Sequence, residues 1–149
     1  MTRIRVLVQR EAHASDLPLP QLMTPGSSGM DLCSAEPGEV VVPAGELRLV
    51  RTGLRIAIPA GYEAQIRPRS GLALKHGVTL ANSPGTIDSD YRGPISLIVI
   101  NHGQDVFRVS RGMRVAQMVF QEVVTPELEL VESLDLTERA EGGFGHTGH

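Results

Sequence analysis

Two short segments of the chain carry residue types that bind anions or face a ligand. In Pro68-Arg69-Ser70-Gly71, an arginine, a hydroxyl and a glycine stand where a strand pattern gives way to a helix start. The unpaired N–H groups of a helix start attract anions, so this segment is a candidate anion site. A simple capped helix also explains Ser70 and Gly71, and the sequence alone leaves both interpretations open.

The second segment is bounded by proline and glycine, and it reads Ser83-Pro84-Gly85-Thr86-Ile87-Asp88-Ser89-Asp90-Tyr91-Arg92-Gly93. These residue types predict a turn between two apolar runs, with one carboxylate and one aromatic ring on it. Flanking strands hold such a turn still while its side chains face a ligand. Tyr91 could equally be a core tyrosine without such a role.

Asp31 and Gln117 are polar residues in apolar surroundings. Asp31 stands in Gly29-Met30-Asp31-Leu32, on a predicted strand, where an unpaired carboxylate is costly. Gln117 interrupts an alternating apolar pattern in the segment 111–118. A buried Asp–Arg ion pair and an amide bonded to the backbone are the ordinary explanations, and a binding site is the alternative.

Glycines gather at the end of the chain, around Phe144 in residues 142–149. Backbone amides of glycines can wrap phosphate oxygens, and a segment of this kind can become ordered on binding. By itself, however, a glycine-rich end with one aromatic residue indicates a flexible tail.

Strands must position these residues, because short apolar runs with period two dominate and helix is scarce. We expect strands within residues 4–8, 30–35, 39–42, 46–51, 54–58, 62–66, 95–100 and 113–124. Residues 95–100 are apolar except for Ser96, so both faces of that strand should be covered. One short helix is expected over Ser70–Lys75, with Ser70 as N-cap and His76-Gly77 as its end. The pattern predicts an all-β sandwich or small barrel.

Composition narrows the function classes. The chain has 149 residues, enough for one domain with its own core, and a net charge of −3 that argues against nucleic-acid binding. Its single cysteine, Cys33, excludes an internal disulfide and indicates a reducing, cytoplasmic location. No signal peptide or membrane-spanning segment is recognisable, so a membrane partner is not expected.

Five segments in order resemble the five motifs of the trimeric dUTP pyrophosphatases (dUTPases): 29–32, 68–73, 85–93, 111–118 and 139–148. The resemblance implies a jelly-roll-like β fold, and hydrolysis of dUTP to dUMP and pyrophosphate. It further implies a domain of residues 1–136 and an arm of residues 137–149 that closes over an active site. A homotrimer with shared active sites, Mg²⁺ as cofactor and dUTP as substrate are also implied.

The resemblance also implies a role for each site residue. Asp88 is the general base, Gln117 lies beside the attacking water and the phosphates, and Asp31 helps to position hydrated Mg²⁺ or an arginine. Arg69, Ser70 and Gly71 hold the triphosphate, and Tyr91 lies under the deoxyribose. The remaining expected substrate contacts are Asn82, Thr86, Ile87 and Ser96 around the base, and Arg139, Phe144, Gly145 and Thr147 in the arm.

Two departures from the fifth motif and two rival functions need consideration. Ala140 stands where the family has a glycine, and His146 stands where it has a serine. A dCTP deaminase would need a glutamate near the base, which residues 95–100 do not supply. A catalytically silent nucleotide-binding module is the other alternative, and the joint presence of Asp88, Gln117 and Arg139 argues against it.

Overall fold

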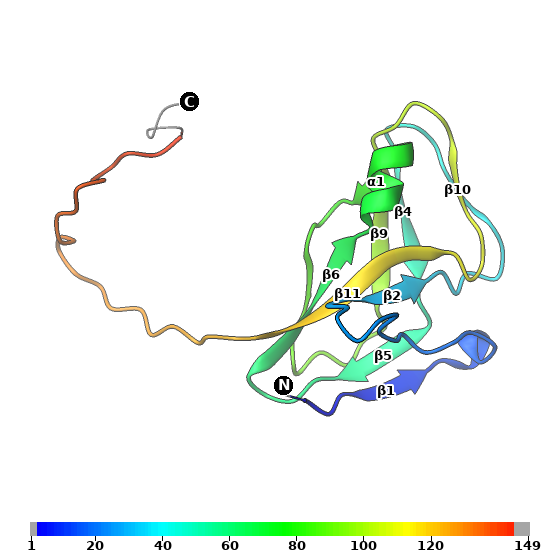
Figure 1. Ribbon diagram of the computed structural model, residues 1–149, viewed down its shortest axis with the longest axis horizontal. Helices are drawn as coiled ribbons and strands as arrows, with labels where there is room; N and C mark the ends of the chain where they lie inside the picture. The colour runs from blue at the N-terminus through cyan, green and yellow to red at the C-terminus, as the bar shows by residue number, and fades with distance from the viewer. Residues whose placement is uncertain (1–2, 145–149) are drawn as a thin grey trace.

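The computed structural model describes residues 3–144. Within these residues the regular elements are strands, apart from one short α-helix and one 3₁₀ turn (Figure 1). The elements of the first half are β1 (Leu7–Arg10), η1 (Ala12–Ala14), β2 (Met30–Cys33), β3 (Val40–Val42), β4 (Leu47–Arg51), β5 (Leu54–Ala57) and β6 (Tyr62–Pro68). Those of the second half are α1 (Ser70–His76), β7 (Val78–Leu80), β8 (Gly85–Ile87), β9 (Ser96–Asn101), β10 (Phe107–Val109) and β11 (Arg114–Glu122).

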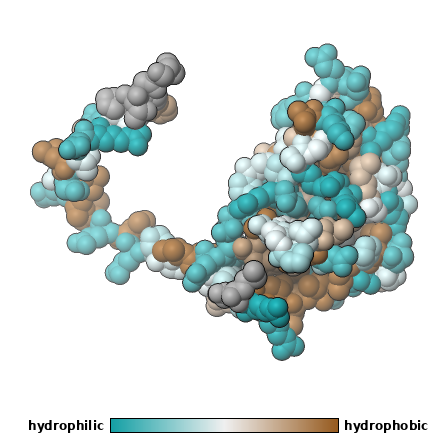
Figure 2. All heavy atoms as spheres, viewed as in Figure 1, coloured by the Kyte–Doolittle hydropathy of each residue, from teal (hydrophilic) through white to brown (hydrophobic). Residues whose placement is uncertain are grey.

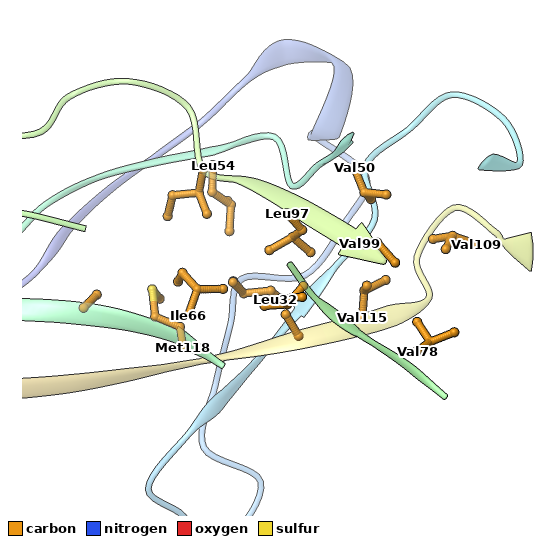
Figure 3. Close-up of a cluster of buried hydrophobic side chains, with 14 of the residues drawn as sticks. Leu32, Val50, Leu54, Ile66, Val78, Leu97, Val99, Val109, Val115 and Met118 are labelled. Carbon is orange, nitrogen blue, oxygen red and sulfur yellow. The ribbon is translucent and has the colours of Figure 1, made fainter. Parts of the chain in front are cut away.

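Two antiparallel sheets enclose the core. One has the strand order β2-β11-β6-β8, and the other has the order β4-β9-β7. Their inward side chains form one buried cluster, which Figure 3 shows with Leu32 and Ile66 from the first sheet near Leu97 from the second. Two further antiparallel pairs, β1-β5 and β3-β10, complete the fold. The predicted all-β sandwich is confirmed.

The core is made of small aliphatic side chains, because the chain has no tryptophan and only 3% aromatic residues. Leu32, Val50 and Val99 have no exposed surface at all. β-branched and aliphatic side chains of this size fit the pleated surfaces of facing sheets. The two sheets thereby form a rigid frame for the loops at their ends.

Several details of the strand predictions were wrong. The turn expected over residues 83–93 is shorter, since Gly85–Ile87 form β8 and pair with β6. The strand expected over residues 95–100 was predicted to be covered on both faces, but it is buried on one face and only half-buried on the other. The helix start also differs: Arg69, not Ser70, is the N-cap, and Ser70 is the first residue of α1. α1 ends at Gly77, as predicted, and Gly77 has the left-handed conformation there.

The body of the fold leaves apolar surface exposed, notably on one sheet and beside β1. The outer face of β4-β9-β7 carries Leu47 and Leu49, which are 52% and 59% exposed, opposite the half-buried Ile100 and Ile98. A groove on the β1 side of the body is lined mostly by apolar side chains, among them Ile4, Val8, Leu19, Met30, Ile56 and Phe120. Figure 2 shows an apolar area on the lower part of the body.

After Glu122 the chain leaves the body and extends outward as an exposed segment (Figure 1). Within the described part of this segment, residues 123–144, there is neither helix nor strand. Its leucines are almost fully exposed: Leu128, Leu130, Leu134 and Leu136. From here on, the arm means the whole segment from residue 123 onward, which includes the residues 137–149 that the resemblance implies as the closing arm.

Candidate functional site

A carboxylate between two arginines forms the centre of the site. Asp31 on β2 forms an ion pair with Arg69, with 3.1 Å between Oδ1 and Nε. It forms a second ion pair with Arg114, with 3.6 Å between Oδ2 and Nη1. The Arg69 guanidinium also donates to the backbone oxygen of Arg114 at 3.2 Å. The Asp–Arg pair left open by the sequence is therefore present, and it fixes two guanidinium groups at one edge of the sheet.

A bulge in β11 brings Arg114 to this cluster. The register with β2 shifts between Arg114 and Ala116, and both Val115 and Ala116 are buried. An extra residue in one strand turns the following side chains to the other face. Gln117 is three positions after Arg114, so in a regular strand the two side chains would point to opposite faces of the sheet. The bulge brings them to the same face. Arg114 was not predicted as a site residue, because no residue pattern in the segment marks the bulge.

Gln117 lies next to this cluster and is hydrogen-bonded to the backbone. Its Nε2 donates to the Pro68 oxygen at 3.0 Å, and its neighbours across the sheet are Asp31 and Arg67. Its amide oxygen packs against Gly29, where an added Cβ would come within 2.5 Å of Oε1. The amide is thus held beside the end of β6, where α1 begins.

The start of α1 completes this group of residues. The Arg69 backbone is extended and its oxygen accepts the N–H of Ala73 at 3.2 Å. Ser70 and Gly71 are exposed in the first turn, where N–H groups lack partners within the helix. We call Asp31, Arg69, Ser70, Arg114 and Gln117 the arginine cluster.

Asp88 and Tyr91 lie on a turn that is held by its own hydrogen bonds. The backbone N–H of Tyr91 donates to the backbone oxygen of Asp88 at 3.1 Å, and the Arg92 guanidinium donates to the backbone oxygen of Ser89 at 2.7 Å. Arg55 on β5 donates to the Arg92 oxygen at 3.1 Å. Both predicted side chains are exposed, so the turn presents them to solvent while its backbone is fixed.

The other predicted base contacts lie around β8. Asn82 is exposed in the connection before β8, and its Nδ2 lies beside Gly85. Thr86 and Ile87 lie on β8 itself, paired with β6. Ser96 is apart from them, since it begins β9 in the other sheet and pairs with Arg51 of β4.

Within one copy of the chain, Asp88 and the arginine cluster lie at opposite ends of β6. Ile87 pairs with Ala64 near the start of this strand, whereas Gln117 pairs with Arg67 near its end. Arg69 follows five positions after Ala64, which corresponds to about 16 Å along an extended strand. The two groups therefore do not meet in a single copy.

The arm residues lie away from both groups. Arg139 donates through Nε to the Gly142 oxygen at 2.8 Å, a bond within the arm. Ala140 and Phe144 both have positive φ, 45° and 49°, so the position where the family has glycine adopts a glycine-like conformation here. Gly145 and Thr147, two predicted contacts, are outside the described residues.

Three other observations concern metal ligands, the cysteine and membrane-spanning helices. In residues 3–144, no group of three or more His, Cys, Asp and Glu side chains is arranged to hold a metal ion. Burial raises the pKa of the Cys33 thiol, which disfavours its nucleophilic thiolate. No helix in the same range is long and apolar enough to span a membrane.

Comparison with known proteins gives one consistent result. The dUTPase family model matches residues 15–148. A deoxyuridine 5′-triphosphate nucleotidohydrolase of Caldanaerobacter subterraneus is 55% identical over 141 residues, which is 95% of each chain. The dUTPase of Staphylococcus bacteriophage 80alpha, solved with dUPNHPP, is 25% identical and superposes with a TM-score of 0.88 over 97% of this chain and 99% of its own.

A variant of the phage phi11 dUTPase from S. aureus has the same fold, with a TM-score of 0.78 over 89% of this chain and 99% of its own at 22% identity. Its structure describes the coordination of a structural Mg(II) ion. The family match over most of the chain and the high identity of the curated relative lead to one conclusion: this chain belongs to the dUTPase family.

Proposed function

We propose that the protein hydrolyses dUTP to dUMP and pyrophosphate, which keeps uracil out of DNA and supplies dUMP for thymidylate synthesis. Family membership supports this activity, and the arginine cluster is the observation in this chain that carries it. Two guanidinium groups, an exposed hydroxyl and a helix start converge there, and together they suit a polyphosphate. The single cysteine fits a cytoplasmic enzyme.

The arginine cluster holds the triphosphate in this proposal. Arg69 binds phosphate oxygens through its guanidinium, and the first turn of α1 offers Ser70 and Gly71. Gln117 keeps its amide beside the same oxygens, because its bond to Pro68 fixes its position. Asp31 orients Arg69 through an ion pair, with 3.1 Å between Oδ1 and Nε.

Base and sugar recognition belong to β8 and the turn after it. The amide of Asn82 supplies a donor and an acceptor for the uracil edge, and the backbone of Thr86 and Ile87 lines the pocket. The Tyr91 ring lies under the deoxyribose, where a ribose 2′-hydroxyl would clash with it. Ser96 contributes from the start of β9.

Asp88 acts as the general base. Its carboxylate takes a proton from a water molecule, and the water oxygen forms a bond to the α-phosphorus. The bond from that phosphorus to the α–β bridging oxygen breaks, and pyrophosphate leaves with the electron pair. Because Asp88 is exposed on a fixed turn, it can meet a nucleotide held by another element.

Mg²⁺ fits this site as an ion held mainly by the nucleotide. Both oxygens of Asp31 already face guanidinium groups, so this carboxylate suits contact through water rather than direct coordination. Mg²⁺ commonly keeps several waters and takes the rest of its ligands from phosphates. When bound, it neutralises charge on the triphosphate.

The active unit is a homotrimer with shared sites. The separation along β6 supports sharing, because Asp88 of one copy can reach the arginine cluster only if that cluster belongs to another copy. The exposed leucines on β4 and in the arm also support assembly, because contact with another copy would remove their apolar side chains from water.

The arm closes over a site in this proposal. Arg139 reaches the γ-phosphate, and Phe144 stacks on the uracil ring, with Gly145 and Thr147 beside it. Alternate apolar residues, Leu128 with Leu130 and Leu134 with Leu136, match a strand that covers an apolar surface on one face. The groove beside β1 is such a surface, and β1 pairs with β5 alone in the described residues.

Replacement of Asp88 by asparagine tests the proposed chemistry. We expect Asp88→Asn to slow dUTP turnover by about 10²–10⁴-fold, because a general base contributes that much, while the affinity for a non-hydrolysable analogue is kept. Pyrophosphate release and calorimetric titration measure the two quantities. Asp90→Asn, two residues away on the same exposed turn, is the matched control. Unchanged turnover in Asp88→Asn would remove Asp88 from its role.

A further inference from the structure

We infer that Gly93 is a specificity-determining position, because it leaves the space in which the Tyr91 ring is held. The inference rests on the proposed role of Tyr91 in sugar recognition. It adds that the ring's place depends on the absence of a side chain two residues further along the same turn.

The geometry of the turn carries the inference. The Tyr91 ring folds back over Gly93, and its hydroxyl donates to the Pro94 oxygen at 3.1 Å. A Cβ added to Gly93 would lie 2.5 Å from Cζ and 2.8 Å from Cε2 of Tyr91, and closer still to its hydroxyl. These separations are far inside van der Waals contact, so any other residue at this position must displace the ring.

Residue 93 must lack a side chain because of the space that the Tyr91 ring occupies, and not because of backbone strain. Gly93 is not among the residues with positive φ, so an L-residue can adopt its backbone conformation. The three nearest atoms all belong to the far end of one side chain, and Tyr91 is 42% exposed. The ring can therefore swing into solvent without disturbing the fold.

The rest of the turn should hold when the ring moves. The bond from the Tyr91 N–H to the Asp88 oxygen and the bond from Arg55 to the Arg92 oxygen involve no atom of the tyrosine ring. A methyl group at residue 93 thus separates two functions of the turn. It displaces the Tyr91 ring, which lies under the deoxyribose in the proposed complex, and leaves the carboxylate of Asp88 in place.

The test compares Gly93→Ala, Tyr91→Ala and the double variant with the parent protein, each assayed for kcat/KM with dUTP and with UTP. We expect Gly93→Ala to lower the dUTP-to-UTP ratio by about tenfold or more, as misfit by one methyl group does in a binding pocket. The double variant should show the same ratio as Tyr91→Ala, because Gly93 acts only through that ring. The thermal midpoint of Gly93→Ala should stay near that of the parent protein.

Gly38→Ala is the matched control, since a Cβ there meets no atom within 4 Å and its φ is not positive. A parent-like ratio in Gly93→Ala, together with a lowered ratio in Tyr91→Ala, would overturn the role of Gly93 alone. A parent-like ratio in Tyr91→Ala would overturn the role of both residues. Additive losses in the double variant would show that Gly93 acts other than through Tyr91.

Discussion

At the scale of single residues, Asp31 is the charge that allows two arginines to stand together. Arg69 and Arg114 each face one of its oxygens, and the carboxylate side chain is only 23% exposed. Without it, the two guanidinium groups would repel each other and turn towards water. An anion site of this kind is pre-organised, because its cations are in place before the phosphate arrives.

Substitution of Asp31 by asparagine tests this arrangement. We expect Asp31→Asn to raise the KM for dUTP about tenfold or more, because the ion pairs that hold Arg69 and Arg114 in place are lost. The affinity for dUMP, which lacks the β- and γ-phosphates, should change much less. Steady-state kinetics and calorimetry measure the two effects.

Asp16→Asn is the control for that variant, because Asp16 also pairs with an arginine, Arg111, but outside the cluster. Equal weakening of dUTP and dUMP would contradict a role confined to the outer phosphates.

Residue types allowed much of the site to be predicted, though the individual roles remain predictions. Asp31 was recognisable because a carboxylate among apolar residues needs a partner, and the structure provides two. Arg114 was not recognisable, since a bulge has no residue signature in this segment. Ser70 was predicted as the N-cap but is the first residue of α1, because Arg69, with an extended backbone, is the N-cap.

At the scale of elements, one ion pair joins the two layers of the fold. Glu36, just after β2, accepts the backbone N–H of Arg51 on β4 at 2.8 Å and a guanidinium nitrogen at 2.7 Å. Glu36 is nearly buried, and the Arg51 side chain beside it is half-exposed. The hydrogen bonds from Arg51 hold the pKa of the Glu36 carboxyl below its ordinary value near 4.5.

This lowered pKa predicts a pH-dependent contribution to stability. The ionised carboxylate stabilises the folded state above the unfolded pKa, near 4.5, and that contribution disappears as the pH falls through the lower folded pKa. We expect Glu36→Gln to lower the free energy of unfolding by about 1–2 kcal/mol at pH 7, because charge-assisted bonds to a partly exposed partner are lost. Below pH 4 the difference from the parent protein should shrink.

Urea unfolding at pH 7 and below pH 4 measures the free energy of unfolding of both proteins. Glu39→Gln is the control, since its pair with Arg108 is exposed on both sides and should contribute less than about 1 kcal/mol. A difference between Glu36→Gln and the parent protein that does not depend on pH would contradict the assignment.

Strand positions were predictable where alternation was strong and uncertain where elements were short. Leu54 and Ile56 alternate with half-buried residues, and β5 lies where that pattern predicts. β8 and β10 have three residues each, too few for a period to emerge, and they exist because β6 and β3 pair with them. Tertiary pairing thus decides the short strands.

At the scale of the whole molecule, three features of one copy support the proposed assembly. The two halves of the proposed site lie at opposite ends of β6, and the arm extends into solvent with its leucines uncovered (Figure 1). The outer face of the strand 95–100 is likewise only half-covered in one copy. The proposed homotrimer accounts for all three features, because each copy would then supply what its neighbour lacks.

Complementation between two inactive variants tests the shared site most directly. Asp88→Asn and Arg69→Gln are each purified, unfolded in urea, mixed in equal amounts and refolded, and pyrophosphate release from dUTP is measured. If Asp88 of one copy serves the arginine cluster of another, about a quarter of the sites in the mixture unite two intact halves and activity returns to about that fraction of the parent protein. If both residues serve a site within one copy, every site carries a lesion. A mixture no more active than the two variants refolded separately would contradict the shared site.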